Sequence, residues 1–187
     1  MTIACLLLAA GQSKRFGAGD KIAAPLNDTP LGLHAARTLR ALPLASRLVV
    51  TNRSDLDWSG WTIVRNGQPD TGIGHSIALG TAAARAAGAT AILLALGDMP
   101  FVPASHFERL LSHYRGPDSL AASSDGQHPM PPALFGARWF DALEALCGDR
   151  GARGLLDQAA LVETLPDHLA DVDSADDLQA LQRRFLP

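Results

Sequence analysis

A loop of small and basic residues follows the first apolar run of the chain. It reads Leu8-Ala9-Ala10-Gly11-Gln12-Ser13-Lys14-Arg15-Phe16-Gly17-Ala18-Gly19-Asp20-Lys21. Small residues let the backbone approach a ligand closely, and its N–H groups can point at phosphate oxygens. Arg15 and Lys21 would add positive charge for a polyphosphate. The loop is therefore typical of a triphosphate-binding site, and a solvated surface loop of the same composition is the alternative.

Two common phosphate-binding signatures are excluded by spacing. A Walker A loop requires GxxxxGK[ST], and a dinucleotide fingerprint requires GxGxxG. The loop contains neither string. The loop is therefore neither a Walker A loop nor a dinucleotide-binding fingerprint.

A carboxylate follows a later apolar run, in the sequence Gly97-Asp98-Met99-Pro100. Because residues 91–96 form a predicted central strand, Asp98 should lie at the carboxyl end of that strand, where open α/β sheets bind ligands. Mg²⁺ accepts one or two carboxylates together with phosphate oxygens and waters. The placement of Asp98 therefore suits a metal ligand, and a turn residue between Gly97 and Pro100 is the alternative.

The segment from Gly67 to Ser76 precedes a strong helical pattern. Its backbone amides, around Gly74, and the Ser76 hydroxyl could contact a base or a ribose. Ser76 suits a helix N-cap equally well, and the two uses of its hydroxyl can coexist. His75 is interpreted as a loop residue.

Two more segments carry side chains that suit the phosphate of an acceptor. The sequence Gly148-Asp149-Arg150-Gly151-Ala152-Arg153 joins two predicted helices, and a guanidinium group can contact phosphate in a bidentate way. The candidate acceptor-binding residues are His128, Asp149, Arg150 and Arg153. A simple helix stop and restart is the alternative for residues 148–153.

The elements that must position these side chains follow an alternating pattern. Short runs rich in Val, Ile and Leu alternate with amphipathic stretches, which indicates βαβ units around a mostly parallel sheet. Strands are predicted at residues 3–8, 47–51, 62–64, 91–96, 120–123, 132–135, 161–164 and 170–172. Helices are predicted at residues 30–42, 76–87, 104–114, 138–147, 152–158 and 175–185. Ser174 is a predicted N-cap, with Asp176 and Asp177 in the first turn of the last helix.

Composition limits the class of protein and its partners. The 187 residues suit a single domain, residues 1–187, with 47% hydrophobic and 19% charged residues and a net charge of -3. This charge predicts no nucleic-acid or membrane partner. Cys5 and Cys147 match no disulfide or zinc spacing, and the first apolar run lacks the basic flank of a signal peptide. We therefore expect a cytoplasmic protein.

The loop resembles the signature LAAGxSxRxG, followed closely by lysine, of the MobA-like nucleotidyltransferases. Within that family the chain is most similar to molybdenum cofactor cytidylyltransferases, because comparable segments recur in order at residues 72–77, 97–100, 148–153 and 171–178. The sequence departs from that pattern in three places. One extra residue lies between Gly17 and Lys21, Met99 stands where glutamine is common, and Ser174-Ala175 replaces Thr-Pro.

The resemblance implies a three-layer, Rossmann-like nucleotidyltransferase fold with a mostly parallel, mixed central sheet. It implies that Asp98 and Asp173 hold Mg²⁺, with Asp171 as the alternative second ligand; Asp173 could instead serve only the helix that follows it. The implied catalytic residues are Lys21, Arg15 and Asp98. The implied nucleotide contacts are Leu8, Ala9, Ala10, Gly11, Ser13, Arg15, Lys21, Gly74, Ser76 and Asp98.

The implied reaction transfers CMP from CTP to the terminal phosphate of molybdenum-molybdopterin, with a molybdenum hydroxylase as a possible client. The Ala9-Ala10 pair favours CTP over GTP, because guanylyl members have a more glycine-rich loop. Three alternatives stay open: a guanylyltransferase, transfer to another phosphorylated acceptor, and a non-catalytic insertion chaperone for the molybdenum cofactor. The set Arg15, Lys21, Asp98 and Asp173 argues against the chaperone, because a carrier needs no metal-triphosphate site.

Overall fold

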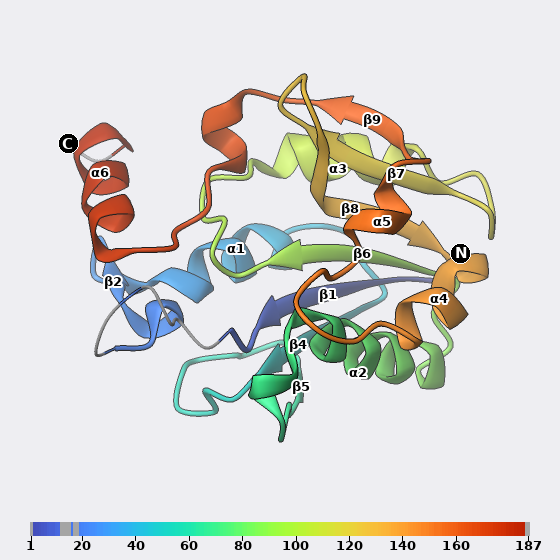
Figure 1. Ribbon diagram of the computed structural model, residues 1–187, viewed down its shortest axis with the longest axis horizontal. Helices are drawn as coiled ribbons and strands as arrows, with labels where there is room; N and C mark the ends of the chain where they lie inside the picture. The colour runs from blue at the N-terminus through green and yellow to red at the C-terminus, as the bar shows by residue number, and fades with distance from the viewer. Residues whose placement is uncertain (1, 12–15, 17–18, 186–187) are drawn as a thin grey trace.

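A seven-stranded sheet forms the centre of the computed structural model, which describes residues 2–11, 16 and 19–185 (Figure 1). The strand order is β5-β4-β1-β6-β8-β7-β9. Their bounds are β1 (Ile3–Ala9), β4 (Ser46–Thr51), β5 (Thr62–Val64), β6 (Ala91–Leu96), β7 (Leu120–Ser124), β8 (Pro129–Gly136) and β9 (Ala160–Glu163). Only β8 runs antiparallel to its neighbours among these strands, so the predicted α/β class with a mostly parallel, mixed sheet is confirmed.

Helices cover both faces of the sheet, which makes three layers. They are α1 (Leu31–Arg40), α2 (Ile73–Ala86), α3 (Ala104–Ser112), α4 (Phe140–Glu144), α5 (Arg153–Leu156) and α6 (Ala175–Phe185). Among the described helices, none is both long enough and apolar enough to cross a bilayer.

The alternation of side chains along β1 divides the core in two. Cys5 and Leu7 pack with side chains of α1 and α3, whereas Leu6 and Leu8 pack with side chains of α2, α4 and α5. Every residue of β1 is buried, as expected for a central parallel strand. Burial of each such leucine contributes about 1.5–3 kcal/mol, so the edge at which β1 ends is rigidly supported.

The position of β1 in the sheet creates a place where ligands can bind. The chain leaves β1 and returns as β4 on one side, and the later strand β6 pairs with β1 on the other side. The strand order therefore reverses between β1 and β6, and open α/β sheets bind ligands at the carboxyl ends of strands at such a reversal. In Figure 1 the arrowheads of β1 and β6 mark that edge, on the left.

The last helix, α6, packs outside the sheet on the same side as these carboxyl ends (Figure 1). Leu178 and Leu181 of α6 form a small core with Leu26, Leu31 and Val172. Leu26 belongs to a two-stranded hairpin of β2 (Pro25–Leu26) and β3 (Thr29–Pro30). The segment before α6 is thereby fixed against residues from the beginning of the chain.

The observed elements differ from the predicted ones mainly in the second half of the chain. The predicted helix 138–147 is a 3-10 turn, Ala137–Trp139, followed by the five residues of α4. The predicted strand 170–172 is wrong, because Val172 pairs its N–H with the carbonyl of Asp98 and joins no strand. Helix α2 begins at Ile73 and not at Ser76.

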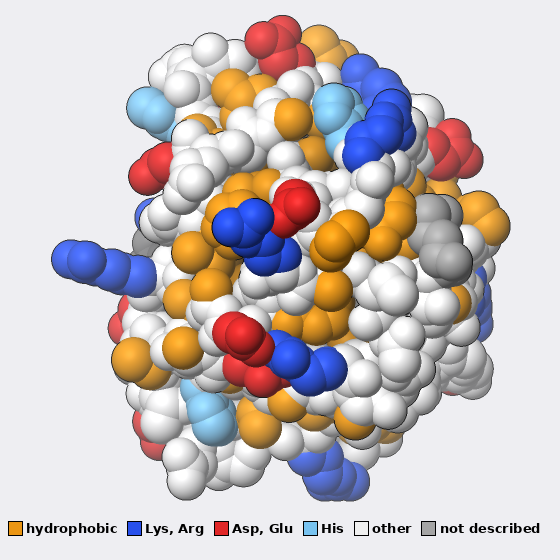
Figure 2. Space-filling model, turned by 90° about the vertical axis from the view of Figure 1, so that its right-hand side faces the viewer, with side chains coloured by type: hydrophobic (Ala, Val, Ile, Leu, Met, Phe, Trp, Pro, Cys, Tyr) orange, Lys and Arg blue, Asp and Glu red, His pale blue; other side chains and the backbone are white. Residues whose placement is uncertain are grey.

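The opposite end of the molecule, at the amino ends of β1 and β6, carries charges of both signs. Figure 2 shows this side, where basic and acidic side chains are scattered among hydrophobic and uncharged ones. Exposed ion pairs lie at this end, for example Arg138 with Asp118 at 2.7 Å, because β8 ends and β7 begins there. Pairs of this kind, exposed to water, add little stability.

Candidate active site

Lys21 is held in place by the short 3-10 helix η1 (Lys21–Ala23) that it begins. Asp20 caps this helix, because its carboxylate accepts a hydrogen bond from the N–H of Ile22 at 3.0 Å. The buried side chain of Ile22 lies against α1, and a Cβ atom at Gly32 would come within 2.6 Å of Ile22 Cγ2. Gly32 therefore allows η1 to pack closely against α1. This packing fixes the backbone position from which the Lys21 side chain extends.

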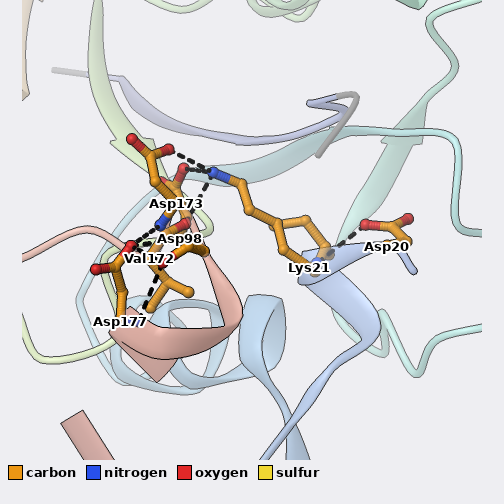
Figure 3. A network of polar contacts seen from close by, with 8 residues as sticks. Asp20, Lys21, Asp98, Val172, Asp173 and Asp177 are labelled. Carbon is orange, nitrogen blue, oxygen red and sulfur yellow. Dashed lines mark hydrogen bonds and ion pairs between the residues drawn. The ribbon is translucent and has the colours of Figure 1, made fainter. Parts of the chain in front are cut away.

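The Lys21 side chain points into a group of oxygen atoms (Figure 3). Its Nζ lies 2.6 Å from Asp98 Oδ2, 2.9 Å from the carbonyl oxygen of Val172 and 3.4 Å from Asp173 Oδ1. Lys21 is only 8% exposed. Burial lowers the pKa of Lys21, but the charge and hydrogen bond of Asp98, followed by those of Asp173, outweigh it and raise the pKa. Lys21 is therefore a charged, nearly buried ammonium group at neutral pH.

Asp98 lies just beyond the carboxyl end of β6, as predicted. The preceding residue, Gly97, donates its N–H to the carbonyl of Leu8 at 2.8 Å, which joins the end of β6 to the end of β1. Asp98 Oδ1 is buried and has no hydrogen-bond partner among the described residues. A buried carboxylate oxygen without a partner is costly unless a ligand or ion satisfies it.

Asp173 reaches the same place from the other end of the chain. The N–H of Val172 donates to the carbonyl of Asp98 at 3.0 Å, which places residue 173 beside Asp98. The predicted N-cap of α6 is present as a reciprocal pair, because Ser174 Oγ accepts from the N–H of Asp177 and Asp177 accepts from the N–H of Ser174. This cap holds Asp173 at the edge of the site.

The carboxylates and the carbonyl fit a hard divalent cation. Mg²⁺ prefers oxygen ligands, and the unpartnered Asp98 Oδ1 supplies one that the protein does not otherwise use. Asp171, the alternative second ligand, is exposed and lies close enough to Asp98 and Asp173 to be affected by their charges. Partial desolvation, followed by the negative charges of Asp98 and Asp173, raises the pKa of Asp171. The negative charges of Asp98 and Asp173 thus extend to Asp171, although the Lys21 ammonium partly offsets them.

The predicted nucleotide loop begins at the carboxyl end of β1. Leu8, Ala9 and Ala10 are buried and Gly11 is exposed. Ala9 packs into the core on the side of α1, where its Cβ lies 3.3 Å from the position that a Cβ of Gly97 would take, whereas Ala10 faces the other side of the sheet. The two alanines therefore do not share one environment. Ser13 and Arg15 lie outside the described residues.

The segment at the start of α2 packs tightly against residues 147–149. Gly74 donates its N–H to the carbonyl of Gly148, and Gly148 donates to the carbonyl of Thr71. Ser76 is the fourth residue of α2, so it is not the N-cap; its Oγ accepts a hydrogen bond from Asn66 Nδ2 at 3.0 Å. Both Ser76 and Asn66 are buried. The Ser76 hydroxyl is thus fixed by a side chain that the sequence analysis did not select.

The candidate acceptor residues lie on two separate segments. Asp149, Arg150 and Arg153 are exposed beside the start of α2, and their side chains form no hydrogen bond or ion pair within the described part of the chain. His128 is exposed in the turn between β7 and β8, which lies at the carboxyl edge because β7 runs parallel to β6. Within the described part of the chain, no hydrogen bond or ion pair joins His128 to residues 149–153.

Three residues at this edge were not predicted as site residues from the sequence. Arg53 follows β4 and contacts Asp20 at 3.4 Å, beside Lys21 in the chain. Asn66 follows β5 and holds Ser76. Both could have been found as polar residues directly after predicted parallel strands. Val172 could not, because it contributes a backbone carbonyl, which every residue has.

Comparison with known proteins identifies the family. The model of the MobA-like NTP transferase domain matches residues 5–164. This chain belongs to that family. Relatives similar to it are the purine catabolism protein PucB of Bacillus subtilis, 30% identical over 95% of both chains, and the nicotine blue oxidoreductase of Paenarthrobacter nicotinovorans, 31% identical over 96% of this chain and 93% of the relative.

Solved structures agree with this fold. A nucleotidyl transferase from Methanothermobacter thermautotroptrophicus superimposes with a TM-score of 0.84 at 24% identity, covering 99% of this chain and 98% of the other. Rv0371C of Mycobacterium tuberculosis, solved as a manganese complex, gives a TM-score of 0.72 at 21% identity, covering 98% and 99%. The chain is therefore a MobA-like nucleotidyltransferase with a nucleoside triphosphate as substrate, and nucleotidyltransferases of this family use divalent metals.

Proposed function

We propose that this chain is a cytoplasmic, magnesium-dependent cytidylyltransferase that transfers CMP from CTP to the terminal phosphate of a molybdenum-pterin cofactor. The observation that carries the proposal is the convergence of Lys21, Asp98 and Asp173 where the strand order reverses. A cation-binding group of oxygens and a buried ammonium at one point are suited to a reaction in which negative charge moves between phosphates.

The proposed reaction is an in-line displacement. An oxygen of the acceptor's terminal phosphate attacks the α-phosphorus of CTP, the bond between the α-phosphorus and the bridging oxygen breaks, and pyrophosphate leaves. A phosphate monoester has a second pKa of about 6 and is largely ionised at neutral pH, so no protein base is required. The protein's contribution is positioning and charge neutralisation.

Each residue of the group has a proposed role. Asp98 and Asp173 would hold Mg²⁺, which supplies positive charge to the phosphate oxygens. Lys21 would stabilise the charge that develops around the α-phosphorus, and Arg15 with the loop amides would hold the β- and γ-phosphates. Asp149, Arg150, Arg153 and His128 are proposed to contact the acceptor.

The choice of CTP rests on the loop after β1 and on Ser76. Ala9 and Ala10 carry methyl groups in a loop that is more glycine-rich in guanylyl members of the family, and a methyl group beside the base would leave less room for a purine. Asn66 fixes the Ser76 hydroxyl. A hydroxyl held in one orientation can discriminate between bases, because a wrong base leaves it unpaired at a cost of about 1–3 kcal/mol.

Release of pyrophosphate tests the proposal directly. The protein with Mg²⁺ is given each of the four nucleoside triphosphates, with and without molybdenum-pterin, and pyrophosphate is measured. We expect pyrophosphate release with CTP, and only in the presence of molybdenum-pterin. Release with GTP, or with a different phosphorylated acceptor, would identify another transferase of this family, and tight pterin binding without release would identify a carrier that delivers the cofactor to a molybdenum hydroxylase.

A second candidate function comes from the name of one relative. The similarity to nicotine blue oxidoreductase favours an oxidoreductase, although the loop after β1 lacks the GxGxxG fingerprint of dinucleotide binding. The same preparation is therefore assayed for oxidation of NADH and NADPH with nicotine blue. Turnover in this assay, with no pyrophosphate release from any triphosphate, would replace the cytidylyltransferase proposal.

A further inference from the structure

We propose that Lys21 closes the metal site of the nucleotide-free protein, so that a divalent ion binds only when a triphosphate draws the lysine away. This inference rests on the proposed function, because it assumes that Asp98 and Asp173 hold the metal. It adds an order of events: in the empty enzyme the ammonium group occupies the position of the ion.

The surroundings of the ammonium group are those of a hard cation. Three oxygens from two carboxylates and one carbonyl surround Lys21 Nζ within 3.4 Å, and all three come from the loop after β6 and the segment before α6 (Figure 3). Carboxylate and carbonyl oxygens are also the ligands that Mg²⁺ prefers. The lysine therefore uses Asp98 Oδ2 and Asp173 Oδ1, which belong to the two carboxylates that the proposal gives to the metal, whereas Asp98 Oδ1 has no partner among the described residues.

The ammonium group and the ion cannot share these ligands at full strength. Magnesium binds oxygen at about 2.1 Å, so an ion on Asp98 would lie within a few ångströms of an ammonium that is itself 2.6 Å from Asp98 Oδ2. Like charges at that separation repel strongly in a partly buried site. Lys21 is nearly buried and its Nζ contacts both carboxylates, so we expect binding of the ion to require movement of this Nζ.

A triphosphate supplies the place to which Lys21 can move. The lysine begins η1, at the end of the predicted phosphate loop, and its side chain is a flexible four-carbon chain. Phosphate oxygens at the ends of β1 and β6 would offer it new negative partners while the ion takes Asp98 and Asp173. Exchange of these partners would turn Lys21 from a bridge between carboxylates into a contact of the reacting phosphate.

Binding of Mn²⁺ without nucleotide tests the inference. Electron paramagnetic resonance of free Mn²⁺ gives the dissociation constant for wild type, Lys21→Met, Lys21→Arg and the double variant Lys21→Met/Asp98→Asn. If the lysine competes for the ligands, Lys21→Met should bind Mn²⁺ at least about tenfold more tightly than wild type, because the competent state is no longer a minor one. Lys21→Arg should bind Mn²⁺ no more tightly than wild type. The double variant should lose the increase in affinity that Lys21→Met shows.

Thermal unfolding guards against a simple loss of fold. Lys21→Met leaves two carboxylates without their cation, so its Tm should be lower than that of wild type, and Mn²⁺ should restore it while leaving the wild-type Tm nearly unchanged. If Lys21→Met does not fold, Lys21→Gln removes the same charge but keeps a hydrogen-bond donor towards Asp98. The Mn²⁺ comparison then uses Lys21→Gln.

Different outcomes test the closing role of Lys21 and the metal site. Equal or weaker Mn²⁺ binding by the neutral variants, with clear binding by wild type, would overturn the closing role of Lys21 and leave the metal site intact. Absence of site-dependent Mn²⁺ binding in every variant would overturn the metal site itself. With a non-hydrolysable CTP analogue, the gap between wild type and Lys21→Met should shrink, and an unchanged gap would show that the triphosphate does not displace the lysine.

Discussion

The backbone N–H of Gly74 donates to the carbonyl oxygen of Gly148 over 2.9 Å, and Gly148 donates in turn to the carbonyl of Thr71 over 3.1 Å. These two bonds join the segment proposed to face the nucleotide to the segment proposed to face the acceptor. A Cβ atom at Gly74 would lie only 2.8 Å from backbone atoms of Cys147. The two segments therefore form one unit, and a change in one must alter the position of the other.

Gly72→Ala should lower the free energy of unfolding and impair acceptor use. Gly72 has a φ of +86°, and a Cβ atom there would overlap the backbone of Gly148. Strained backbone of this kind costs on the order of 1–3 kcal/mol, and the overlap adds to it. Urea denaturation measures the loss. Gly88→Ala is the matched control, because Gly88 has a φ of +77° and open space around it. Equal losses in both variants would show that the close approach adds nothing.

Ala10→Gly should shift the base preference towards GTP. If the methyl group at this position limits the room for a purine, its removal should raise kcat/KM for GTP relative to CTP by about tenfold. Steady-state pyrophosphate release with the two triphosphates gives the ratio. Ala9→Gly serves as the control, because Ala9 packs beside Gly97 on the α1 side of the sheet whereas Ala10 lies on the opposite side. An effect of Ala9→Gly as large as that of Ala10→Gly would contradict a steric filter at Ala10.

Asp98→Asn should reduce pyrophosphate release by about 100-fold or more while the protein stays folded. The amide keeps the shape of the carboxylate but loses the charge that holds a cation and the Lys21 ammonium. Circular dichroism and thermal unfolding check the fold. Asp118→Asn removes an exposed carboxylate that pairs with Arg138 at the other end of the sheet, and should retain full activity. Near-normal turnover in Asp98→Asn would mean that Asp98 only shapes the turn.

His106 should make the protein less stable as the pH falls from 6.5 to about 4. The imidazole is fully buried, with Nε2 beside Ser123 Oγ at 2.7 Å and Nδ1 beside an Arg109 nitrogen at 2.9 Å. Burial, followed by the charges of Arg109 and His168, lowers the pKa of His106 from 6.5 to about 4. Between pH 6.5 and about 4, His106 is therefore protonated in the unfolded chain but neutral in the folded protein. The free energy of unfolding keeps the full contribution of His106 above pH 6.5 and falls below it.

The size of this effect follows from the same difference in pKa. One pKa unit corresponds to about 1.4 kcal/mol, so the loss between pH 6.5 and 4 is on the order of 3 kcal/mol. Urea denaturation at several pH values measures it. His106→Gln should flatten the dependence on pH in this window, whereas His113→Gln, at an exposed position, should leave it unchanged. An unaltered slope in His106→Gln would place the proton uptake elsewhere.

The first half of the fold could be predicted closely from the sequence, because each strand there is a short apolar or β-branched run between polar loops. The strands Thr62–Val64 and Ala91–Leu96 have the predicted bounds. The second half was predicted less well. A helix of ten residues was expected before Gly148, but α4 ends at Glu144, and residues 147 and 148 are committed to backbone contacts with the start of α2. Such long-range pairing leaves no local pattern.

The candidate site shows the same division. Lys21 and Asp98 could be selected because each follows a strand of the predicted sheet, and their residue types suit phosphate and metal chemistry. That the ammonium lies between Asp98 and Asp173 depends on how η1 packs on Gly32 and how Val172 pairs with Asp98. These relationships are three-dimensional, and neither charge nor spacing along the chain predicts them.

The packing of α6 has a consequence for how the protein is made. Ribosomes synthesise the chain from the amino end, so Lys21 and Asp98 are complete long before the small core of Val172, Leu178 and Leu181 with Leu26 and Leu31 can form. Until that core closes, the carbonyl of Val172 and the carboxylate of Asp173 are not held beside Lys21. A growing chain can thus fold its sheet around β1 and β6 and still lack the proposed metal site, whose second carboxylate is positioned only after α6 has been synthesised.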